Sequence, residues 1–313
     1  MAFTLFGKSR ETQSLQLYGK LPIAKDYLRI GCGDGAARDW REWLDRTFGT
    51  VREGEAPLVL REALRFVIGG KEPVQGALWA STDAGGHRAF PFTLLVVRRS
   101  KALIADLQAG LGEAEGVWRS LAEIFAECQT YADGRDLLER QRGRDVQVAP
   151  KGAVSASGAD YDTWVEALWS EEGVGGLNSV FEGVATLARD GYLGPYRLPL
   201  VRELPIRDQV LAWTSVLQEL AALGPEPLPT LFFPPRTLVS SFEMASLVVS
   251  GRPLSEDQVP WLTTGYGTPV LGPGDFCSEY EGDGPELRSA PEEAPPLRLA
   301  LVTALSSFRG GKP

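Results

Sequence analysis

The stretch GALWASTDAGGHRAFPFTLLVV, residues 76–97, contains two β-rich runs separated by a turn. The runs are residues 76–81 and 89–97, and a Gly-Gly pair lies in the segment between them. Runs of this kind on both sides of a glycine-containing turn predict a β-hairpin. A further apolar run at residues 64–68 extends the pattern, so we expect three consecutive antiparallel strands of one sheet.

Two segments around this expected sheet have the apolar spacing of helices. Residues 36–48 place Trp40, Trp43 and Phe48 on one stripe, and residues 116–131 have a similar apolar face. A sheet and amphipathic helices bury their apolar surfaces by packing together. The expected fold class is therefore α+β (α/β), an antiparallel sheet flanked by helices, with the Trp40 and Trp43 stripe packed on the sheet.

The second half of the chain is less regular, and we expect it to be a second, more divergent α/β region. The polar, glycine-punctuated segment 141–158 suggests a boundary that divides the chain into residues 1–145 and 146–313. The elements expected after it are helices at 160–169, 176–189 and 207–223, a strand at 228–233, an element of undecided type at 239–249, and an acidic Gly/Pro-rich loop near 272–296.

Composition excludes several classes of function. The net charge of -9 has the wrong sign for binding nucleic acid or anionic lipid, so neither is expected as a partner. No run approaches the roughly 18 apolar residues that a membrane span needs, so no direct membrane insertion is expected. Three widely spaced cysteines and one histidine predict a cytoplasmic protein with no disulfide framework and no cysteine or multi-histidine metal site. The chain has no GxxxxGK(S/T) motif, the commonest nucleotide site, and no cofactor is expected.

Cys32 and His87 are the residues from which a catalytic pair could be built. A cysteine nucleophile with a histidine base requires the two side chains to approach within roughly 4 Å. His87 lies at the expected hairpin tip, and Cys32 lies in a glycine-rich turn, so the favoured interpretation is structural for both. No catalytic residue is therefore expected, and a Cys-nucleophile enzyme is kept as an alternative.

Two sequence motifs point further. The first is the run 18–22, YGKLP, followed by Asp26 and the tryptophan helix; the second is the run 81–94, STDAGGHRAFPFTL. Together they resemble the opening of the TagF (ImpM) family of type VI secretion-associated proteins. The residues that carry the resemblance are Gly19, Lys20, Pro22, Asp26, Trp40, Trp43, Ser81, Asp83, Gly86, Arg88, Phe90 and Pro91. Two departures are Lys25, in place of the usual glycine, and His87, which is one extra residue in the turn.

The resemblance implies a non-enzymatic, cytoplasmic regulator or accessory protein of a bacterial type VI secretion system. It implies action after translation, by contact with the forkhead-associated scaffold protein or with the base complex at the inner membrane. An alternative from another class is a longin-like module that binds a small GTPase, and this alternative rests on fold analogy alone.

The physical chemistry of the motifs gives two more expectations. Asp26, Asp83 and Arg88 are charged residues in or beside the loops, and we expect a close pair among them with Arg88 as the buried member. Pro91 lies within a strand-like run, so we expect that strand to be an edge strand or to contain a bulge.

Overall fold

The computed structural model describes residues 12–49, 63–109, 111–148, 177–189, 191–200, 206–222, 229–233 and 245–251. The strands are β1 (Thr12–Ser14), β2 (Gln16–Gly19), β3 (Leu28–Ile30), β4 (Leu64–Ile68), β5 (Val74–Trp79), β6 (Phe92–Val97), β7 (Asp145–Gln147), β8 (Tyr196–Leu200), β9 (Thr230–Phe233) and β10 (Ala245–Ser250). The helices are α1 (Gly35–Phe48), α2 (Ser100–Ala109), α3 (Gly112–Cys128), α4 (Gly134–Gln141), α6 (Leu177–Arg189) and α7 (Ile206–Ala221).

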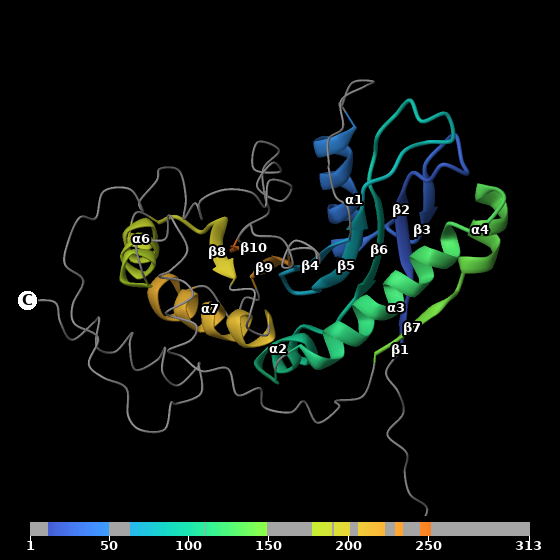
Figure 1. Ribbon diagram of the computed structural model, residues 1–313. Helices are drawn as coiled ribbons and strands as arrows, with labels where there is room; N and C mark the ends of the chain where they lie inside the picture. The colour runs from blue at the N-terminus through green and yellow to red at the C-terminus, as the bar shows by residue number, and fades with distance from the viewer. Residues whose placement is uncertain are drawn as a thin grey trace, which may run out of the picture.

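An eight-stranded antiparallel sheet forms the centre of the fold, in the order β3-β2-β6-β5-β4-β9-β10-β8 (Figure 1). A separate two-stranded ribbon pairs β1 with β7. The expected meander is confirmed, because β4, β5 and β6 are consecutive antiparallel neighbours. The α+β fold class is confirmed with it.

Pro91 corrects one expectation. Strand β6 begins at Phe92 and lies between β2 and β5, so it is a central strand and the expected edge position is wrong. Pro91 lies immediately before the strand, where its missing N–H removes no hydrogen bond from the ladder.

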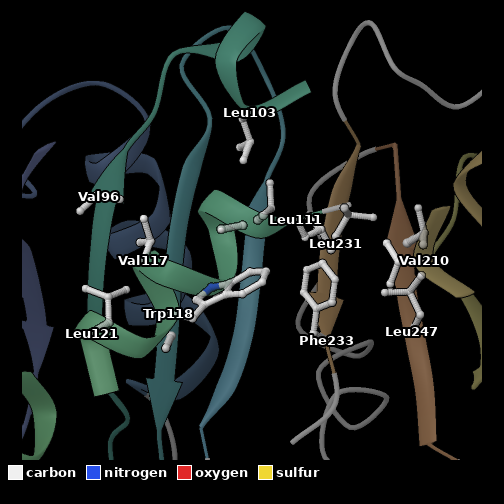
Figure 2. Packing of buried hydrophobic residues seen from close by; sticks show 14 of the residues in the cluster. Val96, Leu103, Leu111, Val117, Trp118, Leu121, Val210, Leu231, Phe233 and Leu247 are labelled. Carbon is white, nitrogen blue, oxygen red and sulfur yellow. The ribbon is translucent and has the colours of Figure 1, made fainter. Parts of the chain in front are cut away.

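The two faces of the sheet pack against different helices. Helix α1 covers one face, and Trp40 and Trp43 are buried there beside Phe66 of β4. Helices α3 and α7 contribute to the core on the other face, as Figure 2 shows for Trp118 and Val210. Because side chains alternate across a strand, the same strands supply both cores. The expected packing of the tryptophan stripe on the sheet is therefore confirmed.

The sheet continues from the first half of the chain into the second. Strand β4 pairs with β9, and this pairing places Arg65 opposite Phe233. The Trp118 ring of α3 lies 4.8 Å from the Phe233 ring, between centroids, so the core also crosses this joint (Figure 2). The boundary between residues 145 and 146 stays a prediction; in space the two halves share one sheet.

Other expected elements have mixed outcomes. The helices at 176–189 and 207–223 and the strand at 228–233 are confirmed as α6, α7 and β9, and the undecided segment overlaps strand β10. The expected helix at 160–169 and the acidic loop near 272–296 lie outside the described residues. The sequence patterns did not predict β8 or α2.

Candidate functional site

The two motif segments lie together at one end of the sheet. One is the turn between β2 and β3, and the other is the loop between β5 and β6 (Figure 1). The backbone N–H of Ala84 donates a hydrogen bond to the carbonyl of Ala24, at 2.9 Å, and this bond joins the two loops. Residues about 60 positions apart in the sequence are thereby brought side by side.

Gly19 makes this approach possible. Its φ is +133°, and a Cβ atom at this position would lie 2.1 Å from the carbonyl oxygen of Pro91. No larger residue fits that space, and the backbone conformation also favours glycine. Gly19 therefore fixes the end of β2 directly against the start of β6.

Asp83 organises the loop between β5 and β6. Its Oδ1 accepts hydrogen bonds from the backbone N–H groups of His87 and Arg88, at 3.1 and 3.4 Å. Its Oδ2 accepts from Nε of Arg88 at 2.9 Å. Gly86, at φ +68°, donates its N–H to the Asp83 carbonyl, which closes the turn. The expected pair between Asp83 and Arg88 is therefore present.

Lys20 approaches Asp83 from the protein interior. Its Nζ lies 3.7 Å from Oδ2 of Asp83, and the two side chains are only 2% and 6% exposed. Burial lowers the pKa of Lys20, and the nearby Arg88 charge lowers it further. Burial alone would raise the pKa of Asp83, but hydrogen bonds from Arg88 and His87, with the Lys20 charge, outweigh it and lower the pKa to about 2. Asp83 is therefore a buried carboxylate that stays ionised.

The expectation that Arg88 is the buried member of the pair is wrong. Its side chain is 61% exposed, and the buried members are Lys20 and Asp83. The reason is the direction of approach, because Lys20 follows a core strand whereas Arg88 lies on the loop and reaches Asp83 from the solvent side. Asp26 is exposed, and within the described residues its side chain forms no hydrogen bond or ion pair.

Tyr27 is a site residue to which the sequence motifs assigned no role. Its ring stacks on Tyr18, with centroids 5.5 Å apart, and meets Phe90 edge-to-face at 4.8 Å. The Lys20 ammonium lies 4.8 Å from the centroid of the same ring. Tyr27 is nevertheless 41% exposed. The available signal was its place directly after Asp26 in the first motif.

We call Lys20, Tyr27, Asp83 and Arg88 the loop cluster. Trp40 and Trp43 are not part of it. Their rings stack on each other in the core, with centroids 4.7 Å apart.

The remaining motif residues support the loops from around the cluster. The Ser81 carbonyl accepts a hydrogen bond from the N–H of Phe90, at 3.0 Å, and this bond helps to close the hairpin. Pro22 is exposed in the turn after β2. Most of the motif residues therefore belong to the loop cluster or support the two loops that carry it.

Cys32 lacks the properties of a nucleophile. It is buried, its Sγ donates to the carbonyl of Leu17 at 3.8 Å, and burial raises its pKa to about 12. The thiolate is the reactive form of cysteine, so this thiol is unreactive at neutral pH. His87 lies on the exposed part of the loop.

The described part of the chain has neither a group of metal-ligating side chains nor a helix that could span a membrane. No three His, Cys, Asp or Glu side chains converge there in a way that could hold a metal ion. No helix in the same part is both long and apolar enough to cross a bilayer.

Part of the chain is similar to a known protein family. No curated protein matches the chain. A solved structure, PA0076 from Pseudomonas aeruginosa PAO1, is 15% identical, with a TM-score of 0.45 over 83% of this chain and 99% of that one. Similarity this low is not a basis for inferring function. Residues 16–134 match the TagF N-terminal domain, described as type VI secretion system-associated. Residues 16–134, which hold the whole loop cluster, are therefore the part of this chain that is similar to a TagF N-terminal domain of the type VI secretion system-associated kind.

Proposed function

We propose that this protein is a non-enzymatic, cytoplasmic regulator of a bacterial type VI secretion system that acts after translation through protein contacts. The observation that carries the proposal is the match of residues 16–134 to the TagF N-terminal domain. The family resemblance suggests two partners, the forkhead-associated scaffold protein and the base complex at the inner membrane.

The geometry of the loop cluster supports a contact function rather than a chemical one. Lys20 and Asp83 neutralise each other inside the protein, and together with Gly19 they hold two loops in fixed positions. A rigid pair of loops on a sheet is a common way to present a binding surface. The Cys-nucleophile alternative is disfavoured because the Cys32 thiol is buried and protonated.

The longin-like alternative gains no support from the described contacts. It predicts binding of a small GTPase, and fold analogy remains its whole basis.

Affinity purification of the tagged full chain from its native host tests the proposal. We expect type VI secretion components to co-purify with the folded protein and a small GTPase to be absent. A matched control is Arg140→Ala, because Arg140 is 71% exposed on α4 and its ion pair is with Asp136 of the same helix. Recovery of no secretion component, from cells in which the protein is expressed and folded, would contradict the proposal.

A further inference from the structure

Arg88 and Tyr27 are the exposed half of the loop cluster, and their surroundings indicate what they contact. Arg88 is 61% exposed and Tyr27 is 41% exposed, while Lys20 and Asp83 beneath them are buried. Tyrosine and arginine are the residue types enriched among the energetically dominant residues of protein interfaces.

The Arg88 guanidinium is held in place by two hydrogen bonds, and some of its N–H donors are unused. Its Nε donates to Asp83 and its Nη2 donates to the carbonyl of Lys25, at 3.3 Å. Within the described residues its Nη1 donates no hydrogen bond. A guanidinium has five N–H donors in a planar fork, and this geometry matches a carboxylate. Because the group is already fixed, binding through Nη1 costs little side-chain entropy.

The positive charge of Arg88 is only partly neutralised within the loop cluster. Asp83 has Lys20 as a buried counter-ion, so two cations share one buried anion. The other charges nearby are Lys25 and Asp26, which have opposite signs, and Asp45 close to Tyr27, whose Oδ2 lies 4.0 Å from Nε of Arg41. The loop end therefore attracts a negatively charged group, although the whole chain carries a net charge of -9.

The Tyr27 ring is fixed in a similar way. Tyr18, Phe90 and Lys20 contact it, and much of the residue stays open to solvent. The ring already attracts the Lys20 ammonium, so a second cation at this place would be repelled by Lys20 and by Arg88. An apolar side chain meets no such penalty and gains from covering the ring.

We propose that Tyr27 and Arg88 form a contact site for a protein segment in which a carboxylate side chain lies next to an apolar one. The carboxylate binds the free Nη1 edge of Arg88, and the apolar side chain packs on the Tyr27 ring. This inference rests on the proposed function, because it assumes that the partner is a protein of the secretion system.

The test compares four forms of the full chain in the native host: wild type, Tyr27→Ser, Arg88→Gln and the control Arg140→Ala. Quantitative mass spectrometry measures the secretion components that co-purify with each. We expect Tyr27→Ser and Arg88→Gln each to lower the recovery by about tenfold or more, the range of a hot-spot residue. The Arg140→Ala control should match wild type. Thermal unfolding of each variant checks that its fold is intact.

The salt dependence of the recovery tests the chemistry of the partner. Loss of a charged contact should make the complex of Arg88→Gln less sensitive to added NaCl than the wild-type complex. If wild type recovers secretion components and both variants recover the same amount, the contact site is wrong and the proposed function stands. If wild type recovers none, the proposed function itself fails. Loss with Tyr27→Ser but not with Arg88→Gln would overturn the carboxylate part of the inference.

Discussion

Strand β6 has an arginine–carboxylate pair beyond each of its ends, and the two pairs differ in which partner is buried. Before the strand, Asp83 is buried and Arg88 is 61% exposed. After the strand, the Arg98 side chain is 0% exposed, and its Nη2 donates to Oε2 of Glu113 at 3.0 Å. The same pair of chemical groups therefore places its arginine at the surface at one end of the strand and in the core at the other.

The pair at the Arg98 end fixes helix α3 to the sheet. Nη1 of Arg98 donates to the side-chain carbonyl of Gln75 at 2.8 Å, and the amide of Gln75 donates to the Ala114 carbonyl at 2.9 Å. The Asp106 carboxylate accepts the N–H groups of Glu113 and Ala114, at 2.8 and 2.7 Å. These bonds satisfy groups at the helix start that would otherwise lack partners. In this network the Arg98 Nε is buried and has no hydrogen-bond partner within the described residues. The spare Nη1 of Arg88 in the loop cluster belongs instead to an exposed side chain.

The largest expected effect is that of Arg98→Ala. Removal of the buried guanidinium leaves Glu113 without its counter-ion and Gln75 without its donor, at a cost of about 3–5 kcal/mol. Urea unfolding followed by circular dichroism measures the free energy of unfolding. Arg140→Ala is the control, since an exposed substitution changes stability by only about 0.5 kcal/mol. A cost below about 1 kcal/mol would show that the network does not stabilise the fold.

The next prediction concerns the two buried members of the loop cluster, which should respond unequally. Asp83→Ala leaves the Lys20 ammonium buried without its counter-ion and removes the acceptor of the loop hydrogen bonds, so it should lower the melting temperature clearly. Lys20→Met removes a buried cation and leaves Asp83 paired with Arg88, so its effect should be much smaller.

The double variant completes this comparison. Adding Lys20→Met to Asp83→Ala should recover part of the lost stability, because no buried charge is then unpaired. Melting temperatures of the four forms give the coupling. Equal losses for the two single variants, with no recovery in the double, would mean that Lys20 and Asp83 do not act as a pair.

A smaller effect is expected from pH. The pKa of Asp83 falls from an ordinary 3.8 to about 2, so its ionised form stabilises the folded state above about pH 4. That contribution declines as the pH falls from 4 towards 2 and is absent below 2. The measurement is the difference in unfolding free energy between wild type and Asp83→Asn across this range. A difference that stays constant or grows on acidification would contradict the assignment.

The sequence predicted those parts of the fold in which the apolar pattern repeats over enough residues to be recognised. Residues 36–48 show a helical stripe over several turns, and the meander has three runs between clear turns. Strand β3 has three residues, too few for an alternation to be recognised. Strand β8 contains Pro199, and a proline within a run of residues is a sequence signal against a strand. In the structure β8 lies at the edge of the sheet, where proline is tolerated.

The candidate site was predicted in its residues but not in its arrangement. The motifs identified Lys20, Asp83 and Arg88, because each lies in or beside a recognisable turn. Burial could not be predicted, because it depends on the side from which each chain segment reaches Asp83. Lys20 comes from the sheet and Arg88 from the loop, and this information lies in the tertiary pairing of Gly19 with Phe92. The same long-range pairing explains why Tyr27 was not recognised as a site residue.

The division of the loop cluster into a buried pair and an exposed contact is tested most directly by Arg88→Ala beside Asp83→Ala. Both substitutions break the same ion pair, and urea unfolding of each full-length variant measures what the break costs. Arg88→Ala should change the unfolding free energy by about 1 kcal/mol or less, as for exposed ion pairs, whereas Asp83→Ala should shift the unfolding midpoint clearly. If Arg88→Ala destabilises the protein as much as Asp83→Ala does, Arg88 is part of the scaffold and the division is wrong.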